Sequence, residues 1–338
     1  MNYRTLGKTG LKVSEIVFGG GAVGGLLIRA DDDTRRQAIA RALQAGVNWI
    51  DTAPMYGEGA SEEAIGWLLA ERPLAERPFV ATKAMLDPNA GDLVGQVERS
   101  LVESLQRLQT DSVDLLQVHN LIYWERGRGN GLSVDDMLEP VRRGLERVRG
   151  AGLTRHVGFT ANGERDALHA VVESGFYETA QIYYNMINPS AGWSVPSGWS
   201  GHDFGNLIGL CQAKDVGVLV IRALAAGVLA TDVRHGREGE IIPNADVESN
   251  ERKAGMLMDA VGQDEGTRAQ IAVRFALSNS GVSGVVVGMA ELDHLVQALG
   301  AVERGPLPAA ALERLRSTVA ADFVQMSTPS MEKHMTRY

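Results

Sequence analysis

Residues 47–62 read Val-Asn-Trp-Ile-Asp-Thr-Ala-Pro-Met-Tyr-Gly-Glu-Gly-Ala-Ser-Glu. The apolar run at residues 47–50 predicts a short buried strand, and this strand ends at an acid, Asp51. The chain then turns, with Tyr56 in the turn, and a helical pattern starts after Ser61. Ligands of α/β proteins bind at the carboxyl ends of the strands, so this acid and this phenol mark a candidate site.

The same alternation of strand and helix patterns continues along the chain. After a predicted hairpin over residues 3–13, apolar runs predict strands at residues 16–18, 47–50, 79–83, 113–119, 155–160, 179–182, 216–222 and 285–288. Apolar residues at helical spacing predict helices at residues 34–45 (capped by Asp33), 61–71, 93–108, 134–149, 164–173, 204–214, 248–261, 267–278, 292–299 and 309–320. Eight such units fit a closed (β/α)8 TIM barrel better than an open sheet. We therefore expect one barrel domain over residues 1–338, with long loops at its C-terminal face.

Composition narrows the class of protein. The 338 residues include 33 Lys and Arg against 42 Asp and Glu, which gives a net charge of −9 and argues against a nucleic-acid or anionic-membrane binder. The single cysteine, Cys211, forms no disulfide or zinc cluster within the chain. No secretory signal and no apolar run long enough to span a membrane is seen, so we expect a cytoplasmic protein. No His, Asp or Glu cluster has the spacing of metal ligands, and no oligomeric state is predicted.

Two other predicted strands also end in groups that can do chemistry. Lys83 ends the strand at 79–83, and His119 ends the strand at 113–119. Taken singly, each residue has an ordinary explanation: Asp51 as a turn cap, Lys83 in solvent, His119 as a structural hydrogen-bonding group and Tyr56 as packing. In a barrel, however, the strand ends converge on one mouth, and all four together are a less ordinary coincidence.

The four groups suit proton transfer. A phenol with a pKa near ~10 is a weak acid at neutral pH, and a buried ammonium beside it favours the phenolate. Asp51 can supply the counter-charge that a buried Lys83 needs. His119 can donate to a substrate oxygen as charge develops there. Tyr56 is then the general acid for a carbonyl being reduced, or the base for an alcohol being oxidised.

Four segments of this chain resemble the motifs of the aldo-keto reductase superfamily. They are residues 51–62 with Gly66, residues 81–83 (Ala-Thr-Lys), residues 113–120 (Val-Asp-Leu-Leu-Gln-Val-His-Asn) and residues 157–160 (Val-Gly-Phe-Thr). The resemblance runs from the hairpin to about Leu299. It implies a (β/α)8 barrel that transfers a hydride between a nicotinamide cofactor and a carbonyl or alcohol. It also implies a catalytic tetrad of Asp51, Tyr56, Lys83 and His119.

The resemblance further implies cofactor contacts, of which some differ from the family pattern. A Ser-Asn pair usually holds the carboxamide; here Thr160 replaces Ser, Ala161 stands in place of Asn, and Asn162 follows. Gln181 matches the family, and Arg222 occupies the position of a stacking aromatic residue, where its planar guanidinium can also stack. Other implied contacts come from Asp51 and from Gly21, Ala22, Leu224, Gly227, Gly288, His294 and Gln297.

The segment after the last strand leaves the choice between NADP and NAD undecided. NADP-preferring relatives place basic and hydroxyl side chains there, whereas this chain has Met289, Ala290 and Glu291, with His294 as the weakly basic residue. Ala298 also replaces a usual Asn. A 2′-phosphate without a strong cationic partner gains little, and Glu291 repels it. We therefore hypothesise that NAD is used at least as well as NADP.

Loops must complete the substrate pocket. Candidates are residues 21–28, 121–124 and 185–200, in which Trp124 and Trp193 are proposed substrate contacts alongside Tyr56 and His119. The tryptophans could equally cover a helix. Three functions stay open at this point: a carbonyl reductase for aldehydes or ketones, an NAD-dependent sugar or alcohol dehydrogenase, and a cofactor-binding regulatory subunit. The complete tetrad favours the enzymes, and the lack of an Arg or Lys cluster favours a neutral small-molecule carbonyl compound or sugar.

Overall fold

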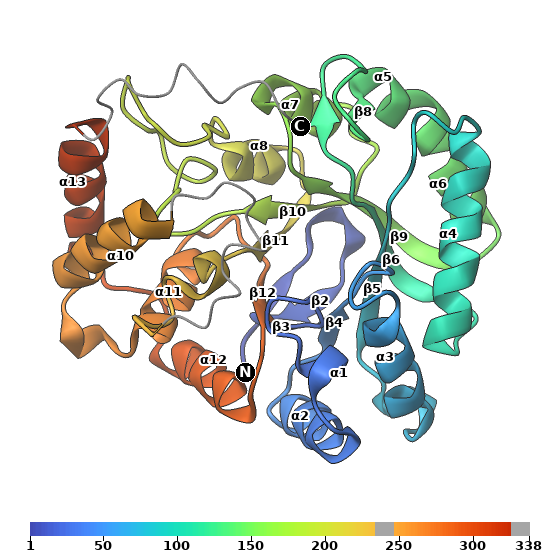
Figure 1. Cartoon of the computed structure of the whole chain (residues 1–338), viewed down its shortest axis with the longest axis horizontal. Helices are drawn as coiled ribbons and strands as arrows, with labels where there is room; N and C mark the ends of the chain where they lie inside the picture. Colours follow the sequence, from blue (N-terminus) through green and yellow to red (C-terminus); the bar gives the residue numbers. More distant parts are fainter. Residues whose placement is uncertain (234–246, 326–338) are drawn as a thin grey trace.

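Eight parallel strands form a closed barrel at the centre of the protein (Figure 1). The structure, a computed structural model, describes residues 1–233 and 247–325. The barrel strands are β3 (Ile16–Gly19), β4 (Trp49–Asp51), β5 (Phe79–Ala84), β6 (Val113–Val118), β9 (Thr154–Ala161), β10 (Thr179–Tyr183), β11 (Gly217–Ile221) and β12 (Gly284–Gly288). Because β12 pairs with β3, the ring is complete, and the predicted (β/α)8 barrel is confirmed.

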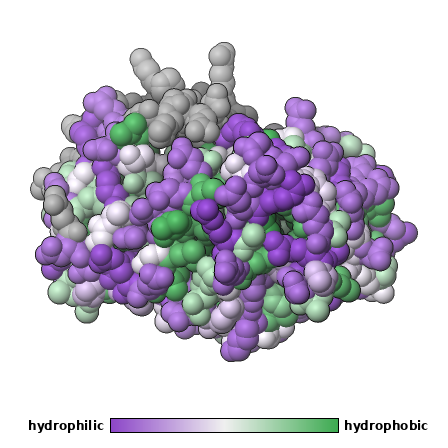
Figure 2. Space-filling view, turned by 90° about the horizontal axis from the view of Figure 1, so that it is seen from below, coloured by the Kyte–Doolittle hydropathy of each residue, from purple (hydrophilic) through white to green (hydrophobic). Residues whose placement is uncertain are grey.

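Helices surround the barrel, and smaller elements cover its ends (Figure 1). The helices are α1 (Leu26–Arg29), α2 (Asp32–Gln44), α3 (Ala60–Ala70), α4 (Leu93–Leu108), α5 (Val134–Asp136), α6 (Arg142–Gly150), α7 (Arg165–Glu173), α8 (Leu207–Ala213), α10 (Val247–Val261), α11 (Arg268–Leu277), α12 (Leu292–Arg304) and α13 (Ala309–Gln325). The predicted hairpin is confirmed as β1 (Tyr3–Thr5) and β2 (Lys12–Ser14), which pair antiparallel. The face on which α2 and α12 lie is mostly hydrophilic, with hydrophobic residues near its middle (Figure 2).

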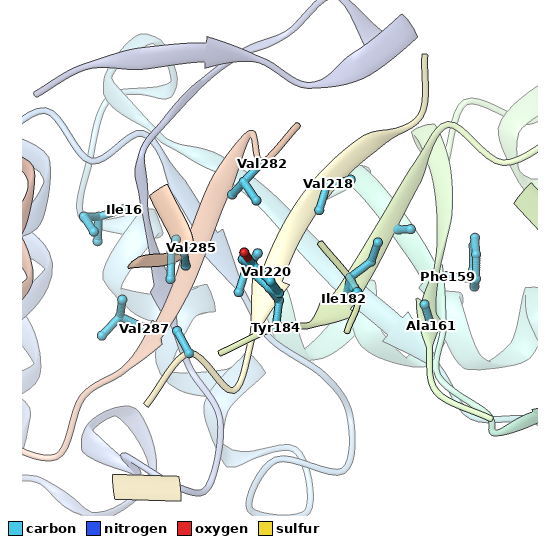
Figure 3. Packing of buried hydrophobic residues seen from close by; sticks show 14 of the residues in the cluster. Ile16, Phe159, Ala161, Ile182, Tyr184, Val218, Val220, Val282, Val285 and Val287 are labelled. Atoms are coloured by element: carbon cyan, nitrogen blue, oxygen red, sulfur yellow. The ribbon is translucent and has the colours of Figure 1, made fainter. Parts of the chain in front are cut away.

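Successive side chains along each strand point alternately out of and into the barrel, which produces two apolar layers. Outward-facing residues such as Ile16, Val220 and Val285 pack under the helices (Figure 3). The inward layer consists of Val17, Trp49, Ala81, Leu115 and Leu219, together with Leu6 and Val13 of the hairpin segment. The hairpin therefore fills the amino end of the barrel, and the carboxyl end is left for the site.

The same alternation places polar residues above this inward layer. Asp51, Lys83 and Gln117 each follow an inward apolar residue by two positions, so they also point inward. The strand register sets Lys83 beside Gln117, and Gln181 beside Thr160. The alternation along these strands thus places the polar side chains together in the barrel interior, on the carboxyl-end side of the inward apolar layer.

Some element boundaries differ from the sequence-based prediction. Asp31, not Asp33, caps α2, because the extended Asp31 accepts the Thr34 N–H at 2.9 Å. The helix predicted at 134–149 is interrupted by a π-helical segment, η3 (Met137–Val141), which contains Pro140. Proline lacks an N–H and disturbs the regular helical ladder.

Other differences concern loops and helix ends. The expected loop at 120–133 contains a short parallel pair, β7 (Ile122–Tyr123) and β8 (Leu132–Ser133). Helices α12 and α13 extend beyond residues 299 and 320, and α8 begins at Leu207 instead of residue 204. Parts of the predicted loop at 223–247 and of the polar tail lie outside the described residues. That the whole chain, residues 1–338, forms one domain remains a proposal.

Candidate active site

A buried ion pair forms the base of the candidate site. Lys83 Nζ donates to Asp51 Oδ1 at 2.6 Å and to the Thr52 carbonyl at 2.8 Å. The Lys83 side chain is fully buried and that of Asp51 is 3% exposed. Asp51 Oδ2 also accepts from Gln181 Nε2 and, at 3.4 Å, from Gln117 Nε2. The carboxylate is therefore held by three donors from three other strands.

Tyr56 lies directly above this pair. Lys83 Nζ is 4.7 Å from the centroid of the Tyr56 ring. The turn that carries Tyr56 contains Gly57 and Gly59, both with positive φ (64° and 97°), where glycine has no steric cost. The Thr52 and Ser61 hydroxyls, 2.9 Å apart, join the two ends of this turn. The phenol is thus fixed over the ammonium by local sequence.

Electrostatics keep Lys83 charged. Burial alone favours the neutral amine, but the attraction of the Asp51 carboxylate and of the Tyr56 oxygen outweighs it and raises the pKa of Lys83. A permanent positive charge therefore lies beside the phenol at neutral pH.

His119 faces the same space in its neutral form. Its ring is perpendicular to that of Tyr56, with 6.5 Å between the centroids. Burial, followed by the nearby charges of Lys83 and Arg222, lowers the pKa of His119 to about 3. Its Nδ1 lies 2.7 Å from the Thr160 hydroxyl oxygen. The imidazole therefore carries one proton at neutral pH and can offer one N–H.

A cavity of about 530 Å³ is lined by Asp51, Tyr56 and His119 and extends across the barrel mouth to the first turns of α11 and α12. Eleven of the residues expected to form the site line it: Gly21, Asp51, Tyr56, His119, Gln181, Arg222, Leu224, Gly227, Gly288, His294 and Gln297. One continuous space thus connects the tetrad with the segment after β12.

The remaining expected residues lie elsewhere. Lys83 is buried below the cavity and Thr160 is fully buried behind His119. Asn162 is half-buried, and its carbonyl accepts the Ile122 N–H at 2.8 Å. Ala22 is exposed, and its carbonyl accepts from Arg29 at 2.8 Å.

The two tryptophans proposed as substrate contacts differ in their surroundings. Trp124 is 56% exposed in the segment that follows β6. Trp193 packs edge-on against Phe275 of α11 at 5.1 Å and lies under Arg316 of α13 at 5.0 Å. The Trp193 ring therefore contacts two helices, and it lies outside the cavity lining.

Several site residues were not anticipated from the sequence. Gln117 is fully buried and contacts Asp51, which its inward position on β6 could have indicated. Thr267, at the start of α11, and Asp293, in the first turn of α12, line the far end of the cavity. On the outward face of β5, outside the site itself, the buried Glu62 accepts from Thr82 Oγ1 at 2.5 Å and from Arg107 Nε at 2.6 Å. This ion pair anchors α3, which begins just after the Tyr56 turn.

Neither a metal centre nor a membrane span appears in the part of the chain that the structure describes. Residues 1–233 and 247–325 contain no group of three or more His, Cys, Asp or Glu side chains that could hold a metal ion. No helix within those ranges is both long and apolar enough to cross a bilayer.

Comparison with known proteins assigns the family. The family model described as "Aldo/keto reductase family" matches residues 15–320, so this chain belongs to the aldo/keto reductase family. It is 26% identical over 301 residues to L-galactose dehydrogenase of Arabidopsis thaliana, covering 88% of this chain and 87% of that protein. It is also 26% identical over 341 residues to pyridoxal 4-dehydrogenase of Microbacterium luteolum, covering 87% and 91%.

A solved structure agrees with the fold. The holo form of the aldo-keto reductase AKR11C1 from Bacillus halodurans matches with a TM-score of 0.73 at 22% identity, covering 94% of this chain and 96% of that one. The resemblance seen in the sequence is confirmed. The protein is therefore an oxidoreductase of a family that uses a nicotinamide cofactor and acts on small-molecule carbonyl compounds.

Proposed function

We propose that this protein transfers a hydride between NAD(P)H and the carbonyl carbon of an aldehyde or ketone, with Tyr56 as the general acid. The observation that carries the proposal is the buried Lys83, which touches Asp51 on one side and the Tyr56 ring on the other. A buried lysine is costly, and one that faces a phenol at a cavity is typical of a tuned proton donor.

The residues present fit a nicotinamide cofactor. Gln181 lines the cavity, and its buried Oε1 has no hydrogen-bond partner among the described residues. That oxygen is free to accept from a carboxamide NH2 group, while Nε2 stays on Asp51. We propose that Arg222 stacks on the nicotinamide ring, that Gly288 contacts the phosphates and that Gln297 contacts the adenine edge. A bound nicotinamide supplies or accepts the hydride.

Side chains of the protein supply the proton for the substrate oxygen and favour its transfer. The Lys83 ammonium stabilises negative charge on the Tyr56 oxygen, so the phenol gives up its proton more readily. Asp51 keeps Lys83 charged and in place. Neutral His119 donates one N–H to the substrate oxygen and orients the carbonyl. Neither Trp124 nor Trp193 lines the cavity, but Trp124 is 56% exposed after the carboxyl end of β6 and is kept as the proposed substrate contact.

A second direction of the same chemistry, an NAD-dependent alcohol or sugar dehydrogenase, also has support. The cavity wall formed by residues 267–298 includes Asp293 and, among the described lining residues of that range, neither Lys nor Arg. An acidic residue beside a ribose favours NAD over NADP, because it repels a 2′-phosphate. Two relatives are named as dehydrogenases. A cytoplasmic location remains a prediction.

A substrate screen in both directions tests the proposal. Purified wild-type protein is assayed with nitrobenzaldehyde and phenylglyoxal plus NADPH or NADH, and with aldoses plus NAD or NADP. Tyr56→Phe is the matched control, because it removes only the hydroxyl and should abolish turnover while cofactor affinity stays near normal. Retained kcat in this variant would refute Tyr56 as the proton donor. Cofactor binding without turnover of any compound would favour the regulatory-subunit alternative.

A further inference from the structure

His119 and Thr160 are neighbours on adjacent strand ends. The β6–β9 register pairs Val118 with Phe159, so the next residue on each strand, His119 and Thr160, meets its counterpart. The separation of 2.7 Å between His119 Nδ1 and Thr160 Oγ1 is that of a good hydrogen bond. Thr160 is fully buried, and its β-branched side chain has few rotamers available. The contact between His119 and Thr160 is therefore fixed by strand pairing and by burial in the barrel.

Two arrangements of protons satisfy this distance. In the first, Nδ1–H donates to the threonine oxygen, and the hydroxyl proton must then find another acceptor. In the second, the hydroxyl donates to a bare Nδ1, and the ring proton lies on Nε2. Among the described residues, His119 Nδ1 is the only hydrogen-bond partner of the Thr160 hydroxyl. Because a buried hydroxyl proton without an acceptor is costly, the second arrangement is favoured.

The second arrangement also suits the cavity. His119 lines the cavity, and Nε2 has no hydrogen-bond partner within residues 1–233 and 247–325. A proton on Nε2 gives the ring a donor toward a substrate oxygen, whereas a lone pair there would repel that oxygen. The neutral imidazole has a single ring proton, so its location decides between these outcomes.

We propose that the Thr160 hydroxyl donates to His119 Nδ1 and thereby holds the ring with Nε2–H directed at the substrate oxygen. Thr160 is thus a positioning residue that acts through His119. Thr160 is fully buried and does not line the cavity, so this role is exerted through the histidine ring. This inference rests on the proposed function of the same site.

Histidine NMR tests the arrangement without any turnover. In protein with ¹⁵N-labelled histidine, two-bond ¹H–¹⁵N spectra report which ring nitrogen is protonated, and His119→Asn assigns the signal. The expected result for the wild type without cofactor is the Nε2–H form, with the Nδ1 resonance shifted by an accepted hydrogen bond. The Nδ1–H form in the wild type would overturn the proposal, whether or not the protein proves to be an enzyme.

Two variants separate positioning from cofactor binding. Thr160→Val keeps the shape and removes the hydroxyl; it should move the Nδ1 resonance to its free position and lower kcat by about tenfold at saturating cofactor. Thr160→Ser restores the donor and should recover both the resonance and much of kcat. A valine variant that raises only KM for the cofactor, with kcat and the Nδ1 resonance unchanged, would show that Thr160 serves the carboxamide alone. Absence of turnover in the wild type with the expected Nε2–H spectrum would reject the proposed function and leave the hydrogen bond established.

Discussion

Lys83 Nζ lies 2.6 Å from Asp51 Oδ1, and both side chains are almost completely removed from solvent. A buried ion pair of this kind adds little net stability compared with an apolar pair, but the loss of one partner leaves a charge without compensation. The intact pair therefore adds little to the free energy of unfolding, whereas the removal of Asp51 alone should lower it strongly. Denaturation of single and double variants measures this difference separately from turnover.

Asp51→Asn should lower the free energy of unfolding by about 3 kcal/mol, because Lys83 is then buried without a counter-charge. The double variant Asp51→Asn with Lys83→Met should recover part of this loss. Urea denaturation at neutral pH measures both. Glu146→Gln is the control, because it breaks an exposed pair with Arg142 at 2.9 Å, 42–46% exposed, and should change stability by less than about 0.5 kcal/mol. Equal effects of the buried and the exposed substitution would contradict this prediction.

Arg107→Met should destabilise the protein by about 2–3 kcal/mol, since Glu62 is fully buried and loses its cationic partner. Glu62→Gln should cost less, because the amide oxygen still accepts from Thr82 and the Arg107 cation that loses its partner is 25% exposed to solvent. Thermal unfolding followed by circular dichroism compares the two variants. The order of the two melting temperatures is the decisive result, and a lower value for Glu62→Gln would reject the explanation.

Acidification should destabilise the protein through His119. In the unfolded chain the imidazole takes up a proton near its ordinary pKa of 6.5, whereas the folded chain resists protonation until about pH 3. Between these values the unfolded state binds more protons, so stability is complete above pH 6.5 and decreases as the pH falls. His119→Asn lacks this titration and should lose less stability between pH 7 and pH 5. Parallel acid-dependent losses in the wild type and the variant would exclude His119 as a contributor.

The cofactor preference should follow the charges at the end of the cavity. We expect kcat/KM for NADH to be at least equal to that for NADPH, because Asp293 and Ala290 line the segment where a 2′-phosphate would need a cation. Ala290→Arg should raise kcat/KM for NADPH by about tenfold, as one charge-assisted hydrogen bond to phosphate allows. A preference of the wild type for NADPH of about a hundredfold or more would reject the hypothesis.

The sequence predicted the barrel because each strand is a short apolar run followed by helical periodicity. It also singled out Asp51, Tyr56, Lys83 and His119, because their strand ends must converge once the barrel closes. These are consequences of local pattern and of topology, both of which can be read along the chain.

Contacts that depend on register across strands could not be read in this way. The meeting of His119 with Thr160 depends on the exact pairing of β6 with β9, although β7 and β8 lie between them in the sequence. Loop composition leaves two roles open for Trp193, substrate contact or helix cover, and its packing on Phe275 and Arg316 depends on where α11 and α13 lie. The interruption at η3 likewise reflects how the backbone adapts to Pro140 in packed surroundings.

The loop after β3 is fastened to the end of β12: Leu26 donates to the Met289 carbonyl at 3.0 Å, and a Cβ on Gly24 would come within 2.2 Å of the Met289 backbone nitrogen. The first and last strands of the barrel, β3 and β12, are thus joined both by strand pairing and by contacts between the segments that follow them. During synthesis, a nascent chain that has emerged only to residue 280 already contains the four proposed catalytic residues but lacks the strand that closes the ring. It also lacks the cavity wall supplied by residues 286–298. Formation of the cofactor cleft must therefore wait for the final units of the barrel, and contacts of such long sequence separation make folding slow. The cavity is therefore complete only after Ala298 has been added to the chain.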